Sequence, residues 1–271
     1  MQAITSREYK LMLSTKRFAG DEEALRRAAA NLWGDLAPIL LPSAIAVSGT
    51  DDVTQKRRKV RFFDTAEHWV RANDYVLRER IDLDTDEREV TLKFRHVDRF
   101  ISQDRDMKPA DGFEPDMKFE EDIKPPFQAV YSFSSNVLVN EDTKIDSLKR
   151  INKIYPGLAA SVDEFPDSEA LSAVADFTAV ERVIKGTSFQ IRKEPAVSAA
   201  CSLTVWYDAE TSEQPIVAEF SFKYEDEKED YTARMARRAY DAFSNIQAKL
   251  GPWIDKKSMT KTASVYALSK P

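Results

Sequence analysis

The sequence has few of the residues from which common nucleotide and metal motifs are built. Its seven glycines form neither a GxxxxGK[ST] loop nor a GxGxxG turn, which excludes P-loop and Rossmann-type nucleotide sites. The two histidines, His68 and His96, lie in unrelated contexts without an HExxH motif, which argues against a zinc site of the usual kinds. The single cysteine, Cys201, has no partner for an internal disulfide and is compatible with a reducing compartment.

Long hydrophobic runs and an excess of positive charge are also lacking. No apolar run approaches the roughly 20 residues that a membrane-spanning helix needs. Residues 1–18 mix charges with apolar side chains, unlike a secretory signal, and we therefore expect a cytoplasmic protein that does not bind membranes. The 40 Lys and Arg against 46 Asp and Glu give a net charge of -6. This balance argues against general binding to nucleic acid, but it leaves room for a local basic pocket.

Alternation of polar and apolar residues dominates the chain and predicts an antiparallel β fold in one domain over residues 1–271. The predicted strands are 3–13, 57–63, 75–83, 88–97, 117–123, 178–184, 188–193, 200–208, 216–225 and 260–268. Most links between them are too short for crossover helices, so most of the sheet must be antiparallel.

Two amphipathic helices and one irregular segment interrupt the strands. Residues 21–36 begin with three acids, which suit a helix N-terminus, and their apolar residues recur at three- and four-residue spacing. Residues 229–250 repeat that spacing and end at a Gly-Pro pair. Residues 127–175 alternate polar turns with short apolar pieces, and 148–154 is helical in pattern. We predict that 127–175 is a partly helical insertion or lid.

Several predicted strands carry cations on one face and apolar residues on the other. The cation pairs are Lys59 with Arg61, Arg78 with Arg80, and Lys93 with Arg95. A solvated face of an open sheet is the commoner explanation of such a pattern. Like charges on neighbouring strands are destabilising, however, and a cationic cluster in an acidic protein indicates a bound anion. In a closed barrel of about eight strands, the cations would line a space for one small ligand, and mixed Arg and Lys suit a polyphosphate.

Acidic side chains share the same predicted faces. They are Glu8, Asp208 and Glu219. One interpretation is that they balance the charge of the cations. The other is that they hold Mg²⁺ or Mn²⁺, hard cations that take carboxylate and phosphate oxygens. The residue pattern leaves both interpretations open.

Short motifs in a consistent order resemble the CYTH superfamily, also called triphosphate tunnel metalloenzymes. The resemblance covers nearly the whole chain apart from the predicted insertion. SREYK (6–10) resembles the ExExK signature, VRFFDT (60–65) the (Y/F)FDT segment, LRER (77–80) the LRxR motif and VTLK (90–93) the next strand, which ends in Lys. FEE (119–121), Arg182, YD (207–208), AEFS (218–221) and Lys261 resemble the mid-barrel acids, a strand Arg, a late Asp followed by ExE, and a late Lys.

This resemblance implies an α+β fold: an eight-stranded tunnel with flanking helices that binds triphosphate compounds with a divalent metal. It assigns phosphate binding to Lys10, Arg61, Arg78, Arg80, Lys93, Arg182 and Lys261. It assigns metal binding to Glu8, Glu219, Asp208 and Glu121, with Glu8 and Glu219 also orienting the attacking water. Family members hydrolyse inorganic triphosphate, thiamine triphosphate or RNA 5′-triphosphate ends, or cyclise ATP.

Two departures from the family pattern fall on metal-binding positions. Ser6 replaces the first acid of ExExK, and Ser221 replaces the second acid of the late ExE. A hydroxyl is a poor substitute for a carboxylate on Mg²⁺. We therefore carry two hypotheses: a metal-dependent hydrolase of a small inorganic or organic triphosphate, and a non-catalytic module that binds a polyphosphate or nucleotide. The sequence does not indicate an oligomeric state.

Overall fold

A closed ring of β-strands forms the body of the molecule. The computed structural model describes residues 2–269, without the side chains of residues 50–55. Over that range nine strands close the ring in the order β1-β10-β9-β8-β2-β3-β4-β6-β5 and back to β1. The strands are β1 (Ser6–Met12), β2 (Ala46–Asp64), β3 (Tyr75–Asp82), β4 (Arg88–His96), β5 (Asp116–Lys124), β6 (Gln128–Leu138), β8 (Ala179–Arg192), β9 (Val197–Tyr207) and β10 (Val217–Glu225). A two-residue strand, β7 (Ser172–Ala173), adds to the edge of β2.

The predicted α+β barrel is confirmed, with three differences in detail. The ring holds nine strands among the described residues, where about eight were predicted. Eight of the nine neighbouring pairs are antiparallel, but β1 and β5 run parallel, so that Glu8 lies beside Asp122. Residues 178–193, predicted as two strands, form the single irregular strand β8.

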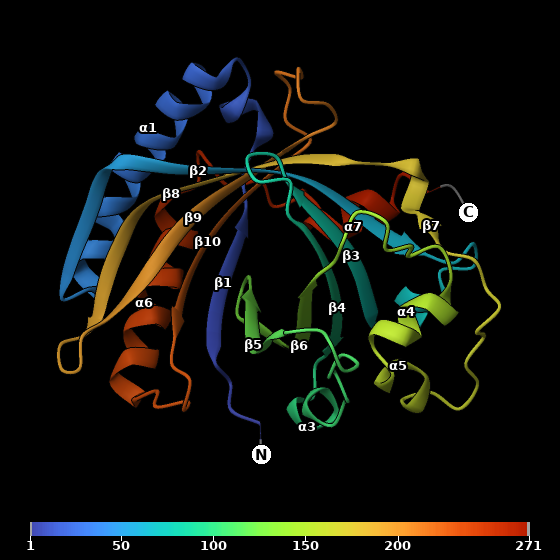
Figure 1. Cartoon of the computed structure of the whole chain (residues 1–271). Helices are drawn as coiled ribbons and strands as arrows, with labels where there is room; N and C mark the ends of the chain where they lie inside the picture. The colour runs from blue at the N-terminus through green and yellow to red at the C-terminus, as the bar shows by residue number, and fades with distance from the viewer. Residues whose placement is uncertain (1, 270–271) are drawn as a thin grey trace.

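Helices α1 (Glu22–Leu40) and α6 (Ala233–Lys249) cover one side of the barrel (Figure 1). Asp21 and Thr232 cap them by accepting hydrogen bonds from backbone N–H groups. The predicted helices 21–36 and 229–250 are thus confirmed, although α1 continues through Pro38 because Leu36 and Leu40 extend its buried face. The two helices pack on the outward faces of β1, β8, β9 and β10, where Tyr9 and Phe222 stack at 4.6 Å.

Helices α4 (Leu148–Ile154) and α5 (Gly157–Ala160) cover the opposite side of the barrel (Figure 1). They pack against outward apolar residues of β3, β4 and β6, and Tyr155 donates hydrogen bonds to two strand carbonyls at 2.8 and 2.9 Å. The predicted insertion 127–175 therefore begins too early in the sequence. Its residues 128–138 are the barrel strand β6, because their outward side chains are buried under α4.

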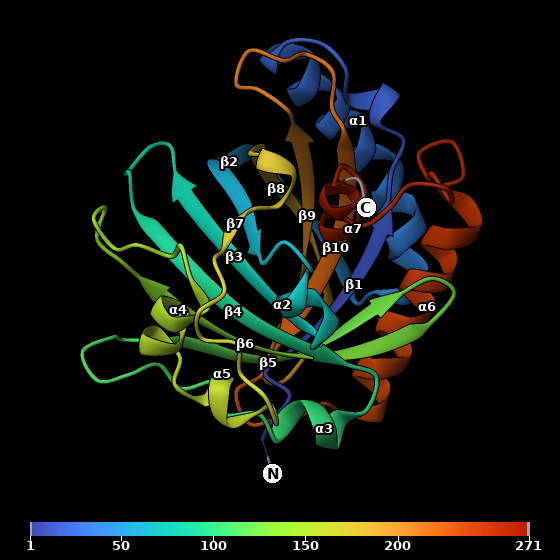
Figure 2. The same ribbon diagram turned by 90° about the vertical axis from the view of Figure 1, so that its right-hand side faces the viewer.

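Residues 260–268, predicted to be the closing strand, are largely helical, so that prediction is wrong. Thr260 caps helix α7 (Lys261–Tyr266), and the ring closes without this segment. Val265 and Tyr266 pack against inward apolar residues at one end of the barrel, among them Phe62 and Trp206. α7 therefore covers that end (Figure 2). Two short helices, α2 (Trp69–Ala72) and α3 (Arg99–Gln103), complete the fold, and none of the helices in the described part of the chain is both long and apolar enough to cross a membrane.

One buried carboxylate ties α7 to the barrel. The Asp64 side chain accepts hydrogen bonds from three backbone N–H groups between Thr65 and Arg71, at 2.8 to 3.1 Å. Its Oδ2 atom also accepts a 2.6 Å hydrogen bond from the hydroxyl of Tyr266. The hydrogen bond from Tyr266 to Asp64 therefore links α7 to the end of β2.

We expect Tyr266→Phe to lower the free energy of unfolding by about 1.5–3 kcal/mol, because a hydrogen bond to a charged group is lost in a buried place. Urea denaturation of the whole chain measures this change. Tyr240→Phe is the matched control, since Tyr240 is 43% exposed and its hydroxyl makes no hydrogen bond among the described residues. Equal stability of the two variants would show that the Tyr266 hydroxyl does not anchor α7.

A candidate anion-binding site inside the barrel

The strand register decides which charged side chains lie inside the barrel. On β3, Arg78 and Arg80 lie opposite Phe62 and Val60 of β2, and these apolar residues meet α7. The same face continues to Thr91 on β4. Nine cations of the strands point into the barrel and are at least partly buried, and Lys261 joins them from α7. The nine are Lys10, Arg58, Arg78, Arg80, Lys93, Arg95, Lys118, Lys124 and Lys223.

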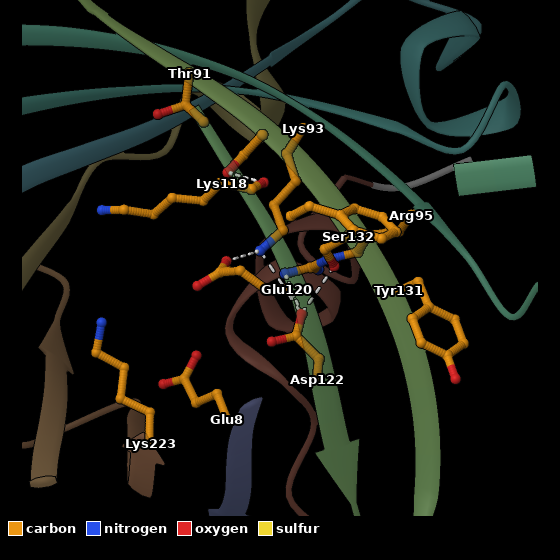
Figure 3. A network of polar contacts seen from close by, with 12 residues as sticks. Glu8, Thr91, Lys93, Arg95, Lys118, Glu120, Asp122, Tyr131, Ser132 and Lys223 are labelled. Carbon is orange, nitrogen blue, oxygen red and sulfur yellow. Dashed lines mark hydrogen bonds and ion pairs between the residues drawn. The ribbon is translucent and has the colours of Figure 1, made fainter. Parts of the chain in front are cut away.

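Acids are interleaved with these cations, and Glu8 and Glu219 are among them, as predicted. The inward acids with a partner inside the barrel are Glu8, Glu89, Glu120, Asp122, Glu181 and Glu219. In Figure 3, Lys93 and Arg95 point toward Glu120 and Asp122, whereas Tyr131 points away. Burying so many cations without acids would cost several kcal/mol for each, which explains the mixture.

Lysine pairs in this interior are tight. The ammonium of Lys10 lies 2.8 Å from a carboxylate oxygen of Glu8 and 2.8 Å from one of Asp122. Lys93 lies 3.1 Å from Glu120. Burial alone would raise the pKa of Asp122, but the charges of the neighbouring lysines and arginine hold it well below its usual range. Asp122 is therefore ionised and engaged.

Four arginines are held much more loosely, and we call them the arginine group. Its members are Arg58, Arg78, Arg80 and Arg95. Their distances to the nearest carboxylate oxygens of Glu181, Glu89 and Asp122 are 3.5 to 3.9 Å, longer than a good charge-assisted hydrogen bond. Their side chains stay 20–33% exposed to solvent.

Donor atoms of the arginine group lack partners. The Nε atoms of Arg78, Arg80 and Arg95 are buried and make no hydrogen bond with any described residue. Burial, followed by the charge of Arg80, lowers the pKa of Arg78 to about 9. Buried donors without a partner are rare in folded proteins and destabilising. The arginine group therefore has spare hydrogen-bonding capacity and uncompensated positive charge, which an anion would satisfy.

Lys10 occupies the place where a metal could be expected. Its burial lowers the pKa of its ammonium, but Asp122, Glu8 and Glu219 together raise that pKa well above its usual value. The three carboxylates thus act on one lysine cation. In the described part of the chain, no three Asp, Glu, His or Cys side chains are placed to share a metal ion. As arranged here, with Lys10 between the acids, the residues do not fit a resident divalent metal.

Seven of the residues predicted for the site lie on the inward faces or at the α7 end of the barrel. They are Glu8, Lys10, Arg78, Arg80, Lys93, Glu219 and Lys261. Among them Glu219 and Lys261 form a 2.8 Å ion pair, and Ser6 and Ser221 are also buried on these faces. The structure brings these residues together, while their roles in binding stay predictions.

Four other predicted residues lie outside the cluster, which corrects those assignments. Arg61 faces outward and donates from Nε to Glu79 at 2.7 Å, because Val60 and Phe62 occupy the inward positions of β2. Arg182 lies 4.8 Å from the ring of Tyr207, whose side chain belongs to the outer core under α1 and α6.

The two remaining corrections concern acids assigned to the metal. Glu121 faces outward, where it pairs with Arg7, because its neighbours Glu120 and Asp122 take the inward positions of β5. Asp208 follows the last residue of β9 and is exposed. Both are therefore removed from the candidate site.

Several interior residues were missed from the sequence. They are Arg58, Glu89, Glu120, Asp122 and Glu181. Arg95 was predicted on the cationic face of Lys93 but was given no role in the site. Glu181 was not recognisable from the sequence: its buried carboxylate accepts a 3.0 Å hydrogen bond from Trp206 Nε1, and only the pairing of β8 with β9 brings these two residues together.

Comparison with known proteins gives weak structural similarity only. No protein-family model matches the chain, and no curated protein matches it either. A proposed adenylyl cyclase from Hippeastrum, described as having a dominant triphosphatase activity, shares 12% identity over 98% of this chain and 97% of its own, with a TM-score of 0.48. A proposed adenylate cyclase of Bacillus halodurans (12%, 97% and 96%, TM-score 0.38) and a protein of Pyrococcus horikoshii (11%, 97% and 100%, TM-score 0.38) are also similar. Similarity at this level assigns no activity to this chain.

The buried carboxylate of Glu181 makes the stability of the protein depend on pH in the acid range. Burial would raise its pKa, but Arg80, Lys261, the Trp206 hydrogen bond and Arg58 lower it from 4.5 to about 2. Its contribution to stability is therefore complete above pH 4.5 and is lost as the pH falls toward 2. At about 1.4 kcal/mol for each pKa unit, that loss is on the order of 3 kcal/mol.

We expect Glu181→Gln to remove this part of the acid sensitivity, so that the variant loses about 3 kcal/mol less than the wild type between pH 5 and pH 2. Urea denaturation across this range measures it. Glu210→Gln removes an exposed acid that pairs with Lys59, and it should keep the slope of the wild type. Parallel curves for the wild type and Glu181→Gln would contradict the lowered pKa.

Proposed function

We propose that the interior of the barrel binds a small molecule that contains a triphosphate. The observation that carries this proposal is the arginine group. Three of its buried Nε donors make no hydrogen bond with any described residue, and its distances to its acids are long. A guanidinium presents its donors as a planar fork, which matches two oxygens of one phosphate. Several such forks on neighbouring strands suit a chain of linked phosphates better than a single one.

Charge inside the barrel supports the same ligand class. Arg78 and Arg80 repel one another, and a phosphate between them would raise the lowered pKa of Arg78. Lys93 lies on the strand next to Arg78 and is also buried, with its pKa lowered by burial despite two neighbouring acids. An anion that reaches Arg78 and Arg80 replaces their long ion pairs with short ones. Binding of the anion is therefore favourable without a change in the conformation of the barrel.

Hydrolysis with Mg²⁺ or Mn²⁺ is the second candidate function, favoured by the convergence of Glu8, Asp122 and Glu219 around Lys10. Lys10 engages Glu8 and Asp122, and Lys261 engages Glu219. Ser6 and Ser221 leave two family positions without a carboxylate. The geometry thus supports binding more directly than turnover. A phosphate-release assay with tripolyphosphate and either metal separates the two: release that depends on the arginine group would establish the hydrolase.

Ligand-induced stabilisation tests the proposed function. We expect tripolyphosphate at a concentration of 100 times its Kd to raise the free energy of unfolding of the wild type by about 2.7 kcal/mol, because the ligand binds only the folded state. A higher melting temperature reports this change. The double variant Arg78→Ala with Arg80→Ala should lose this stabilisation. The control Arg61→Ala with Arg182→Ala removes two arginines whose side chains face outward and should keep it.

The melting temperature of each variant without ligand shows whether it folds, and calorimetry with tripolyphosphate repeats the comparison without heating. Stabilisation that survives in Arg78→Ala with Arg80→Ala, or that is lost in the control, would place the ligand elsewhere.

The role of Lys10 gives a prediction about metals. Replacing its ammonium leaves Glu8 and Asp122 without their shared cation. We expect Lys10→Met to bind Mn²⁺ at least tenfold more tightly than the wild type in calorimetry, because carboxylates without a partner are good ligands for a hard cation. Lys118→Met, which frees only the exposed Asp116, should behave like the wild type. Equal affinities of wild type and Lys10→Met would show that Lys10 does not occupy a potential metal position.

A further inference from the structure

A groove of about 670 Å³ lies on the outside of the barrel, where the end of β8 meets the first turns of α6. Four of the residues that line it are cations: Arg192, Lys193, Arg234 and Arg238. The acids that line it are Glu194 and Asp230. This surplus of positive charge is local, because the whole chain carries a net charge of -6. We call this space the basic groove.

Two arginines of the basic groove are held in place by neighbouring segments. The Nη1 atom of Arg192 donates hydrogen bonds to the carbonyl oxygen and to a carboxylate oxygen of Asp230, both at 3.0 Å. The Nη1 atom of Arg238 donates to the carbonyl oxygen of Ile191 at 2.7 Å. These contacts join the end of β8 to α6 and to the loop before it, so they fix the shape of the groove.

The other two cations of the basic groove are open to a partner. Lys193 and Arg234 are exposed and make no ion pair or side-chain hydrogen bond in the described part of the chain. Among the apolar lining residues, Ile45 is 39% exposed, whereas Ile191 and Met235 are buried. The groove therefore offers a partner charge rather than apolar area, which favours an acidic surface of a protein. The net negative charge of the chain argues against nucleic acid.

An acidic surface of this kind occurs in the chain itself, between α5 and β7. Residues 163–169 read Asp-Glu-Phe-Pro-Asp-Ser-Glu and contain neither Lys nor Arg. Their four acids are exposed, and none of them pairs with a cation among the residues that the structure describes. The four are Asp163, Glu164, Asp167 and Glu169. We call this segment the acidic loop.

The acidic loop is fixed at its base. Backbone N–H groups of Leu148 and Lys149, at the start of α4, donate to two carbonyl oxygens of the loop at 3.0 and 3.1 Å. The ring of Phe165 packs edge-on against Trp69, with 5.5 Å between the ring centroids. An ordered loop loses little conformational freedom when a partner binds it. The acids are therefore presented ready for a complementary surface.

The basic groove and the acidic loop lie on opposite sides of the barrel. The groove borders α6, whereas the loop follows α5 on the other side (Figure 1). The loop therefore cannot reach the groove of its own chain, but it can reach that of a second copy. Two different surfaces that meet in this way make a head-to-tail contact, which repeats into a ring or an open chain of copies.

We propose that the basic groove of one copy of this chain binds the acidic loop of the next copy. Lys193 and Arg234 supply the open positive charge, and the four acids of the loop supply the negative charge. The proposal goes beyond the proposed function, because these residues all lie outside the barrel interior. Exposed ion pairs are individually weak and are screened by salt, so the association is weak and sensitive to salt.

Static light scattering of the whole chain at concentrations up to about 1 mM tests the proposal, since this range covers weak protein contacts. We expect the average mass of the wild type to rise with concentration in about 0.01 M salt and to return to that of one chain in about 1 M salt. The groove variant Lys193→Gln with Arg234→Gln should associate at least about fivefold more weakly, because it loses two ion pairs. The loop variant Glu164→Gln with Asp167→Asn should be weakened to a similar extent.

A mixture of the two variants tests the head-to-tail contact directly. The groove variant keeps its acidic loop, and the loop variant keeps its basic groove. An equimolar mixture should therefore regain the affinity of the wild type for one contact, and its mass should stop rising at that of two chains.

Matched controls separate a specific contact from a general effect of net charge. Lys256→Gln with Lys257→Gln has the net charge of the groove variant, and Asp111→Asn with Glu114→Gln has that of the loop variant. These four residues are exposed and form no ion pair among the described residues, so both controls should associate like the wild type. The melting temperature of each variant shows whether it folds. A wild type that stays a single chain in low salt, a mixture that does not regain association, or equal losses in the controls would overturn the proposal.

Discussion

The pairing of β2 with β3 is the interaction on which the rest of the structure depends. It joins the two ends of a strand order that would otherwise form an open sheet, with six register pairs between Arg58 and Phe63 on the β2 side. In an open sheet the charged face would lie in water, where cations need no partner. Closure encloses that face, and every buried cation then needs either an acid or a ligand. The mixture of acids and cations inside the barrel follows from this requirement.

Closure also explains how apolar surface is distributed. The outward faces of the strands are apolar and need cover, which α1 and α6 supply on one side and α4 on the other. The inward face is apolar near one end, around Val60, Phe62 and Trp206, and α7 covers it there. The barrel interior thus combines a closed apolar end with a charged middle. A charged ligand that enters the barrel meets the arginine group in that middle, away from the apolar end.

Alternation and helical spacing in the sequence predicted most of the elements, because each pattern is local. They could not fix which face of a strand points inward where both faces carry charge. Residues 56–61 read Lys-Arg-Arg-Lys-Val-Arg, and only the pairing with β3 shows that Arg58 lies inside and Arg61 outside. Glu120, Glu121 and Asp122 pose the same problem on β5. The strand prediction for residues 260–268 was wrong for a related reason. Their pattern fits the period of a strand as well as that of a helix, and the cap at Thr260 and contacts with distant strands favour the helix.

The interior has two chemically different walls. On the side of β1 and β5, the acids Glu8, Glu120 and Asp122 form short pairs with lysines. On the side of β2, β3 and β4, the four arginines lie 3.5 Å or more from their acids, and the Nε atoms of three of them make no hydrogen bond with any described residue. Three of these four arginines, on β2 and β3, stand at the seam where the ring closes. The constraint that closes the barrel is therefore also the one that concentrates positive charge. Under the proposed function, the phosphates of the ligand lie toward β2, β3 and β4, and the acids of β1 and β5 face them across the interior.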